Sequence, residues 1–243
     1  MVINQNLIYD IGLHAGRDSE FYLKKGFKVV GVEANPEMAA KAAKYLSEYL
    51  IAGQFNIVQK ALSDSSGAIV SFYVNDEKDD WSSLSQAVAE KNITTSREIR
   101  VTTTTLSNIY AEFGVPYYLK CDIEGGDELI AMQMAKLDPL PNYASFEITT
   151  VSMLGILWGA GYRKFQLVNQ ALNFLTQPPS PASEGEYFAR QFDGHCSGLF
   201  GRELSESRWI DIEQVTSLYL DFINLRDRYE QFCMGWLDVH ATR

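Results

Sequence analysis

A short glycine-containing loop near the N-terminus holds the first residues that could bind a cofactor. In YDIGLHAGRD, Gly12 and Gly16 flank His14, and Asp10 stands directly before the loop. A dinucleotide would call for the closer spacing GxGxxG, whose backbone amides hold a pyrophosphate, and an acid at position 10 would repel that group. S-adenosylmethionine has no phosphate but carries a sulfonium and an ammonium group. The loop therefore favours this cofactor, with both glycines close to its methionine portion and Asp10 close to its positive charge.

Three further acids follow apolar runs that are typical of buried strands. Glu33 ends FKVVGVE, Asp64 follows FNIVQKAL, and Asp122 comes directly after PYYLKC. Because the carboxyl ends of parallel strands share one edge of a sheet, we expect these acids and Asp10 to surround one crevice. In that crevice Glu33 is placed to accept both ribose hydroxyls, and Asp64 could accept a hydrogen bond from the adenine amine.

The elements that must position these residues alternate between apolar runs and helical patterns. The strand NLIYDIG precedes a helix over 18–25, and the strand FKVVGVE precedes NPEMAAKAAKYLSEYL, in which Asn35 can cap a helix that has Pro36 in its first turn. This alternation predicts an α/β fold with a mostly parallel sheet. Further strands are expected in FNIVQKAL, AIVSFYV, REIRVTTTTL, PYYLKCDIEG and YASFEIT, and further helices in SNIYAEFG, 127–136 and 152–160.

The C-terminal third is expected to complete and cover this sheet. YRKFQLV and ALNFLT resemble an antiparallel terminal pair, so residues 1–175 would form the cofactor-binding core. Residues 176–207 show little periodicity, which predicts a long loop of the kind that often has a function. The apolar positions Val215, Leu218, Phe222, Leu225, Tyr229 and Phe232 follow helical spacing. We therefore expect residues 176–243 to pack on the core as a loop and a helix, within a single domain.

Composition limits the partners and the compartment. Acidic residues outnumber basic ones 31 to 21, for a formal net charge of -10, and this argues against a nucleic-acid partner because phosphates need a basic surface. No apolar run reaches membrane-spanning length and the N-terminus is not signal-like, so we expect a cytoplasmic protein with no membrane partner. The three cysteines are far apart, which predicts reduced thiols and no metal site. A small-molecule partner is the better expectation, and a homo-oligomer is compatible with the sequence.

Three segments of the chain resemble the FkbM-type S-adenosylmethionine-dependent methyltransferases. They are YDIGLHAGRDSEFYLKKGFKVVGVEANPEM, ALSDSSG and YLKCDIEGGDEL. The family's D-x-G-x-x-x-G, E-x-N-P and K-x-D-x-E-G motifs occur in order, at Asp10, Gly12, Gly16, Glu33, Asn35, Pro36, Lys120, Asp122, Glu124 and Gly125. His14 stands where many members have Asn. The resemblance implies a Rossmann-like methyltransferase fold, with a mostly parallel seven-stranded sheet, helices on both faces and an antiparallel terminal pair. It also implies methyl transfer, usually to oxygen, on substrates such as sugars or secondary metabolites.

The resemblance extends the expected site. It adds Asn35, Ser63 and a role for Asp122 to the cofactor-binding residues Asp10, Gly12, Gly16, Glu33 and Asp64. Methyl transfer to an alcohol benefits from a general base, and the candidates are Asp122, Glu124 and His14. His195 and His240, in a predicted loop and a terminus, are weaker candidates. The serine-containing loop DDWSSLS around Trp81 is expected to close over the site.

Two alternatives to an O-methyltransferase acting on a small-molecule or glycan hydroxyl stay open. One is an NAD(P)-dependent oxidoreductase with an irregular loop, although no hydride-site pattern such as Tyr-x-x-x-Lys accompanies it. The other is a non-catalytic subunit that binds S-adenosylmethionine but lacks a working base.

Overall fold

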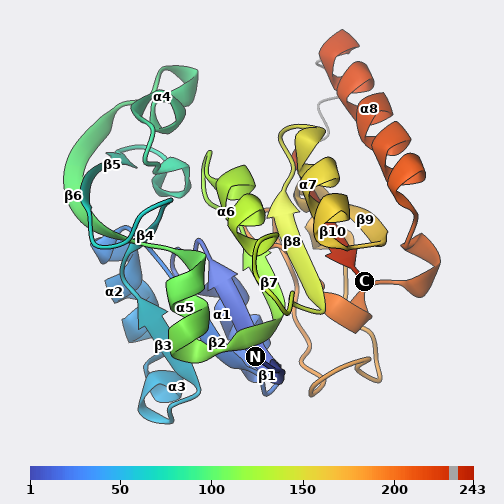
Figure 1. Ribbon diagram of the computed structural model, residues 1–243, viewed down its shortest axis with the longest axis horizontal. Helices are drawn as coiled ribbons and strands as arrows, with labels where there is room; N and C mark the ends of the chain where they lie inside the picture. The colour runs from blue at the N-terminus through green and yellow to red at the C-terminus, as the bar shows by residue number, and fades with distance from the viewer. Residues whose placement is uncertain (230–234) are drawn as a thin grey trace.

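The computed structural model describes residues 1–229 and 235–243, which are built around a seven-stranded sheet in the order β3, β2, β1, β7, β8, β10, β9 (Figure 1). The strands are β1 (Ile3–Ile11), β2 (Lys28–Val32), β3 (Phe55–Val58), β7 (Val115–Cys121), β8 (Tyr143–Glu147), β9 (Lys164–Asn169) and β10 (Leu237–Thr242). Neighbouring strands are parallel except that β10 runs antiparallel to both β8 and β9. The predicted α/β fold, with its mostly parallel seven-stranded sheet and antiparallel terminal pair, is confirmed.

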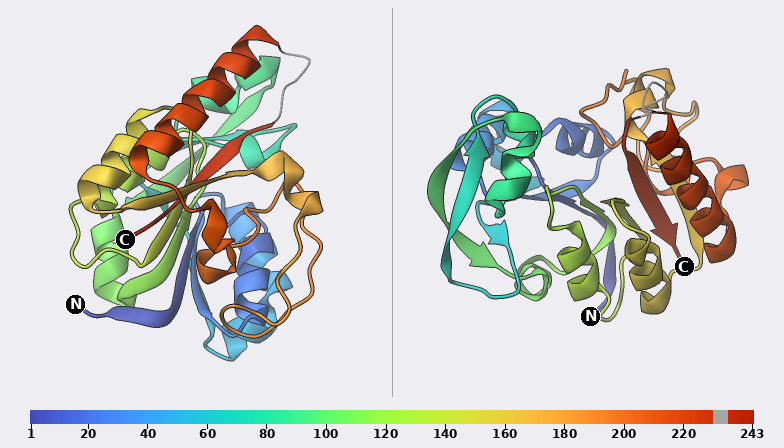
Figure 2. Two further views of the ribbon diagram at one scale, coloured as in Figure 1. Left: turned by 90° about the vertical axis from the view of Figure 1, so that its right-hand side faces the viewer. Right: turned by 90° about the horizontal axis from the view of Figure 1, so that it is seen from above.

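Helices cover both faces of this sheet, as the alternation of apolar side chains along its strands requires. One face packs against α5 (Leu106–Phe113), α6 (Asp127–Met134), α7 (Ser152–Ala160) and α8 (Ile212–Arg228). The other packs against α1 (Arg17–Lys24) and α2 (Pro36–Tyr45), together with Phe192, Cys196 and Phe200 of the long loop. Figure 2 shows these two layers on opposite sides of the strands.

The helix expected from NPEMAAKAAKYLSEYL is divided in two. Oδ1 of Asn35 accepts the backbone N–H of Glu37 at 3.0 Å, which confirms the predicted cap. The helix α2 ends at Tyr45, Leu46 is its C-terminal cap residue, and the short helix α3 (Ser47–Ile51) follows. Leu46, at the break between α2 and α3, is buried in the same apolar cluster as Ala42.

A second, three-stranded sheet forms a lobe beside the main sheet (Figure 1). The expected strand FNIVQKAL is divided between the two sheets, because β3 stays in the main one and β4 (Ala61–Leu62) pairs with β6 (Ser96–Thr104). The strand β5 (Ile69–Asn75) pairs with the other edge of β6. Between β5 and β6 lie the short helices η1 (Asp79–Trp81), α4 (Gln86–Ala89) and η2 (Lys91–Ile93).

The prediction for the end of the sheet was wrong in one respect. ALNFLT forms a 3-10 helix, η3 (Gln170–Leu175), and the antiparallel partner of β9 is β10. Polar residues hide this strand in the sequence, since Asp238 and His240 alternate with Val239 and Ala241 although all four are buried. Residues after 176 therefore contribute a strand to the core instead of only packing on it. His240, expected in a terminus, is fully inside the sheet, and its burial lowers its pKa to about 3.

Residues 176–207 form a long loop with the short 3-10 helices η4 (Gly201–Glu203) and η5 (Glu206–Arg208). The helix α8 begins in a capping box formed by Asp211 and Gln214 and ends at Arg228. Phe232, the last position of the predicted helical spacing, lies outside the described residues. Cys121 and Cys196 are free thiols, and Cys233 also lies outside the described residues. None of the helices described combines the length and apolar character that crossing a membrane requires.

Candidate active site

A cavity of about 540 Å³ lies at the carboxyl ends of β1, β2, β7 and β8. This volume is typical of small-molecule sites. Of the residues expected at the site, the cavity is lined by Gly12, His14, Glu33, Asp122 and Glu124. The expected residues that do not line it are Asp10, Gly16, Asn35, Ser63 and Asp64. The sequence thus located the cavity but assigned too many side chains to its wall.

Asp10 holds Lys120 instead of facing the cavity. Asp10 and Lys120 are register partners in β1 and β7, and Oδ1 of Asp10 lies 3.1 Å from Nζ of Lys120. The other carboxylate oxygen accepts Oγ–H of Ser19 at 2.7 Å. Burial acts to lower the pKa of Lys120, but the carboxylates of Asp10, Asp122 and Asp18 outweigh it and hold that pKa above its ordinary value. The expectation that Asp10 meets the positive charge of a cofactor is therefore corrected.

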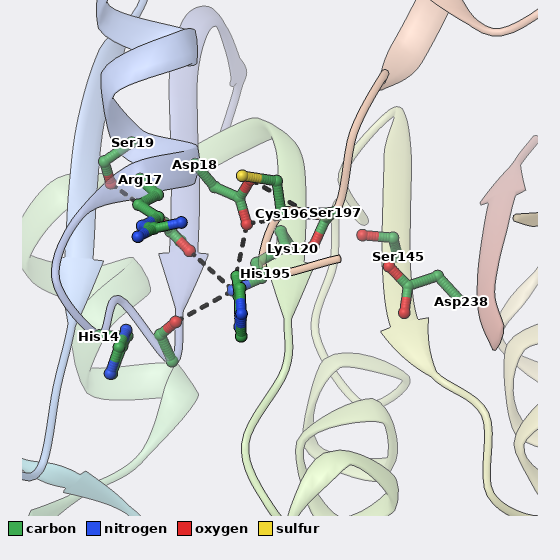
Figure 3. A network of polar contacts seen from close by, with 12 residues as sticks. His14, Arg17, Asp18, Ser19, Lys120, Ser145, His195, Cys196, Ser197 and Asp238 are labelled. Atoms are coloured by element: carbon green, nitrogen blue, oxygen red, sulfur yellow. Dashed lines mark hydrogen bonds and ion pairs between the residues drawn. The ribbon is translucent and has the colours of Figure 1, made fainter. Parts of the chain in front are cut away.

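Lys120 also fixes the glycine-containing loop. Its Nζ donates to the backbone oxygen of Gly12 at 3.0 Å and lies 3.8 Å from Oδ2 of Asp18. Figure 3 shows Lys120 near the centre of this network, with a contact to Asp18 of α1. The buried lysine thus joins β1, β7 and the start of α1 at the cavity wall, which it helps to line.

The structure requires glycine at positions 12 and 16 of the loop for different reasons. Gly12 has φ +80°, and a Cβ atom there would lie 1.9 Å from the backbone oxygen of Asp122, so only glycine lets the loop pack against the end of β7. Gly16 has φ +85° and packs against Leu46 and Ala42 of α2. Gly12 therefore shapes the cavity, whereas Gly16 joins the start of α1 to α2.

Glu33 presents a partly buried carboxylate to the cavity from the end of β2. Its Oε2 accepts the backbone N–H of His14 at 2.7 Å, and its Oε1 accepts that of Asn35 at 2.8 Å. Burial raises the pKa of Glu33, while these two N–H groups act to lower it. Each carboxylate oxygen has a further lone pair, so Glu33 can still accept hydroxyl groups. Asn35 contributes through its backbone and its helix cap instead of a side chain in the cavity.

Ser63 and Asp64 do not line the cavity. They follow β4, where the chain has already turned toward the second sheet, and Asp64 is exposed with its Oδ1 3.3 Å from Oγ of Ser63. The cavity wall in this region comes instead from Lys60, Ala61 and Leu62. The geometry therefore gives no support to a contact between Asp64 and an adenine amine.

At the other end of the cavity, Glu124 is paired with a lysine from the second lobe. Both carboxylate oxygens of Glu124 accept Nζ–H of Lys91 at 2.8 Å. Nζ of Lys91 also lies 4.7 Å from the ring centroid of Trp81. Burial raises the pKa of Glu124 against the opposing effect of Lys91. Asp122, by contrast, lines the cavity without a side-chain hydrogen bond or ion pair to any residue that the structure describes.

Glu147 is a cavity acid that the sequence reasoning missed. It ends β8 and lines the cavity near Asp122 and Glu124. Burial, together with the negative charges of these two acids, raises the pKa of Glu147 to about 7. The signal was present in the sequence, since Glu147 stands at the carboxyl end of the strand YASFEIT just as Glu33 does in FKVVGVE.

The segment around Trp81, residues 79–84, lines the cavity. Its closure over the site stays a prediction, and we refer to it as the covering segment. Nε2 of His14 lies 3.2 Å from Oδ1 of Asp79. Nδ1 of His195, which is mostly exposed in the long loop, lies 3.8 Å from Oδ2 of Asp80. Both histidines line the cavity and contact the covering segment. Within residues 1–229 and 235–243, no group of His, Cys, Asp and Glu side chains has the arrangement of a metal site.

Comparison with solved structures finds methyltransferases of low sequence identity. The chain is similar to a SAM-dependent methyltransferase from Archaeoglobus fulgidus, with 9% identity, a TM-score of 0.42, and 99% of this chain and 87% of that one covered. It is also similar to precorrin-6y C5,15-methyltransferase from Geobacter metallireducens, with 12% identity, a TM-score of 0.41, and coverage of 78% and 77%. A SAM-dependent methyltransferase from Geobacter sulfurreducens, solved with S-adenosyl-L-homocysteine, has 13% identity, a TM-score of 0.36, and coverage of 99% and 84%. These similarities assign no residue and no acceptor to this chain.

Sequence comparison identifies the family. No curated protein matches the chain significantly. The model of the methyltransferase FkbM domain, however, matches residues 10–163, which include the glycine-containing loop, Glu33, Asp122, Glu124 and Glu147. Because this match spans more than half of the sequence and contains the cavity acids, the chain belongs to the FkbM methyltransferase domain family.

Proposed function

We propose that the chain transfers the methyl group of S-adenosylmethionine to a hydroxyl oxygen of a small molecule or glycan. The observation that supports this best is that one cavity is lined both by the loop after β1 with Glu33 and by the acids Asp122, Glu124 and Glu147. In this proposal the loop after β1 and Glu33 form the donor side of the cavity, and Glu124 and Glu147 form its acceptor side. Such an arrangement suits a donor and an acceptor bound side by side.

The residues present fit this donor better than a dinucleotide. The loop offers little free positive charge to a pyrophosphate, because Lys120 is paired with Asp10 and Arg17 lies 2.9 Å from Asp193. The carboxylates of Asp18 and Asp122, which also line the cavity, favour a cation. When bound, S-adenosylmethionine supplies an electrophilic methyl group on a sulfonium sulfur.

The cavity residues divide between binding and catalysis in this proposal. Glu33 accepts the ribose hydroxyls, and the backbone at Gly12 approaches the methionine portion. Asp122, which also lines the cavity, contacts the cofactor or the acceptor. Glu124, which Lys91 holds, acts on the acceptor side. The backbone of His14 belongs to the donor side with the rest of the loop, and its side chain, which contacts Asp79, acts on the acceptor. Alignment of the acceptor oxygen with the methyl group supplies much of the catalysis of such an in-line displacement.

Calorimetry tests the cofactor. We expect the purified chain to bind S-adenosylmethionine and S-adenosylhomocysteine and to bind NAD and NADP far more weakly. Preferential binding of NAD or NADP would overturn the methyltransferase proposal in favour of an oxidoreductase.

An acceptor screen tests the reaction. The chain is incubated with methyl-labelled S-adenosylmethionine and a panel of monosaccharides, oligosaccharides, polyols, phenols and amines, and the labelled products are identified by mass spectrometry. We expect O-methyl products from hydroxyl-bearing acceptors. Labelled N-methyl products alone would contradict the choice of oxygen, and binding of S-adenosylhomocysteine without any transfer would favour a non-catalytic subunit.

A further inference from the structure

Glu147 occupies a position that is surrounded by acids. Cys121 and Phe146 are register partners in β7 and β8, so Asp122 and Glu147 follow them at neighbouring positions of the same sheet edge. On the other side, β10 places Asp238 opposite Glu147. Asp238 is buried and its carboxylate accepts Nε2–H of Gln170 at 2.6 Å. Glu147 therefore lies between two acids in adjacent strands.

The other cavity carboxylates already have partners, with the exception of Asp122. Glu33 accepts two backbone N–H groups, Glu124 accepts two bonds from Lys91, and Asp18 accepts the backbone N–H of Ser197 at 3.1 Å. In the part of the chain that the structure describes, the carboxylate of Glu147 forms no hydrogen bond or ion pair. A carboxylate without a partner is free to accept a proton from a ligand in the cavity.

We propose that Glu147 is the general base that accepts the proton of the acceptor hydroxyl. This inference rests on the proposed O-methyl transfer and names the residue that completes it. The sequence suggested Glu124 as a base, but the proposal gives it a positioning role. Its hydrogen bonds to Lys91 hold that lysine over the ring of Trp81, which belongs to the covering segment.

The proposed step is balanced in atoms and charge. The acceptor oxygen loses its proton to a carboxylate oxygen of Glu147 as it forms the new O–C bond. The electron pair of the breaking C–S bond stays on sulfur, which becomes neutral, and Glu147 later releases the proton to water. Burial and the charges of Asp122 and Glu124, which are opposed by Lys91, raise the pKa of Glu147 to about 7. A base is most effective when its pKa lies near the working pH, so this value suits catalysis near neutrality.

Carboxyl NMR tests the ionisation without any acceptor. The chain is labelled with ¹³C at the glutamate side-chain carboxyl and titrated between pH 3 and pH 9, and Glu147→Gln assigns the signal. We expect a carboxyl signal that titrates near pH 7 and is missing in the variant. Glu128→Gln is the control, because Glu128 is only partly buried and its hydrogen bonds to Ser152 and Thr150 lower its pKa. A Glu147 signal that titrates below pH 5 would overturn this inference alone.

Kinetics with an acceptor found in the screen test the role. We expect Glu147→Gln to lower kcat by roughly 10²- to 10⁴-fold. The fall in kcat that the unmodified chain shows below pH 7 should be absent from the variant. The Kd of S-adenosylhomocysteine should change less than about threefold. Glu147→Asp should recover part of kcat. A Glu147→Gln variant with the kcat and pH profile of the unmodified chain would exclude the base role. Failure of the unmodified chain to bind S-adenosylhomocysteine would instead overturn the proposed function.

Discussion

Nζ of Lys120 lies 3.1 Å from Oδ1 of Asp10, and the two residues face each other across β1 and β7 with both side chains almost completely buried. An ion pair in this position neutralises two charges that would otherwise be buried alone. It also holds the loop whose Gly12 oxygen accepts a bond from the same lysine. Asp10 thus supports the cavity from behind its wall.

Replacing Asp10 by alanine should destabilise the fold strongly. The change leaves Lys120 buried with only more distant carboxylates, and breaking a buried pair in this way costs about 3–5 kcal/mol in the free energy of unfolding. Urea denaturation followed by circular dichroism measures this loss. Arg97→Ala is the control, since it removes a pair with Glu37 in which both side chains are exposed, and should cost at most about 1 kcal/mol. Similar losses in the two variants would show that the buried pair has no special contribution.

Replacing Glu33 by alanine should weaken cofactor binding while the chain stays folded. The variant loses the acceptor proposed for the ribose hydroxyls, and bonds to a charged acceptor contribute about 1.5–3 kcal/mol. We expect the Kd of S-adenosylhomocysteine to rise at least about tenfold in calorimetry. Asp64→Ala is the matched control because Asp64 is exposed and does not line the cavity. Unchanged affinity in folded Glu33→Ala, or an equal loss in Asp64→Ala, would refute the assignment of Glu33.

Replacing Gly12 by alanine should disrupt the junction between the loop and β7. The new Cβ would lie 1.9 Å from the backbone oxygen of Asp122, so one backbone segment must move. Gly53→Ala separates this clash from the cost of the backbone angle, because Gly53 also has positive φ but no atom within 4 Å of a Cβ. We expect Gly53→Ala to cost about 1 kcal/mol and Gly12→Ala to cost clearly more in urea denaturation, with weaker binding of S-adenosylhomocysteine. Equal costs would mean that the contact with Asp122 is not tight.

His240 should make the fold sensitive to acid. Burial lowers the pKa of His240 from 6.5 to about 3, so the folded state keeps it neutral while the unfolded state takes up a proton below pH 6.5. The contribution of neutral His240 to the free energy of unfolding is complete above pH 6.5 and is lost as the pH falls from 6.5 toward 3. Between pH 7 and pH 5 the loss from this group is about 2 kcal/mol.

The variant His240→Leu isolates this contribution. Nε2 of His240 is buried without a hydrogen-bond partner among the described residues, so an apolar side chain leaves no acceptor or donor unpaired. We expect the free energy of unfolding of the variant to fall by about 2 kcal/mol less than that of the unmodified chain between pH 7 and pH 5. Other titrating groups, such as Asp18, are common to both chains and cancel in the comparison. An identical pH dependence in the two chains would show that His240 is not held neutral.

The sequence determined most of the elements as far as β9 and the edge of the sheet at which the site lies. Gly12, Glu33 and Asp122 each stand where an apolar run ends, and the carboxyl ends of parallel strands meet at one edge of a sheet. Local patterns of this kind require only a few neighbouring residues. They also identified the Asn35 cap, whereas the segment around Trp81 that lines the cavity was expected from the family resemblance.

Tertiary structure decided which side chains meet. The pairing of Asp10 with Lys120 depends on the register of two strands far apart in the sequence, and the burial of β10 depends on its insertion between β8 and β9. Glu147 looks like any strand-ending glutamate until Asp122 and Asp238 lie on either side of it. Its pKa follows from burial and from charges that the sequence separates by many residues. Electrostatic interactions depend on distance in space and on exclusion of water, and the order of residues along the chain gives neither.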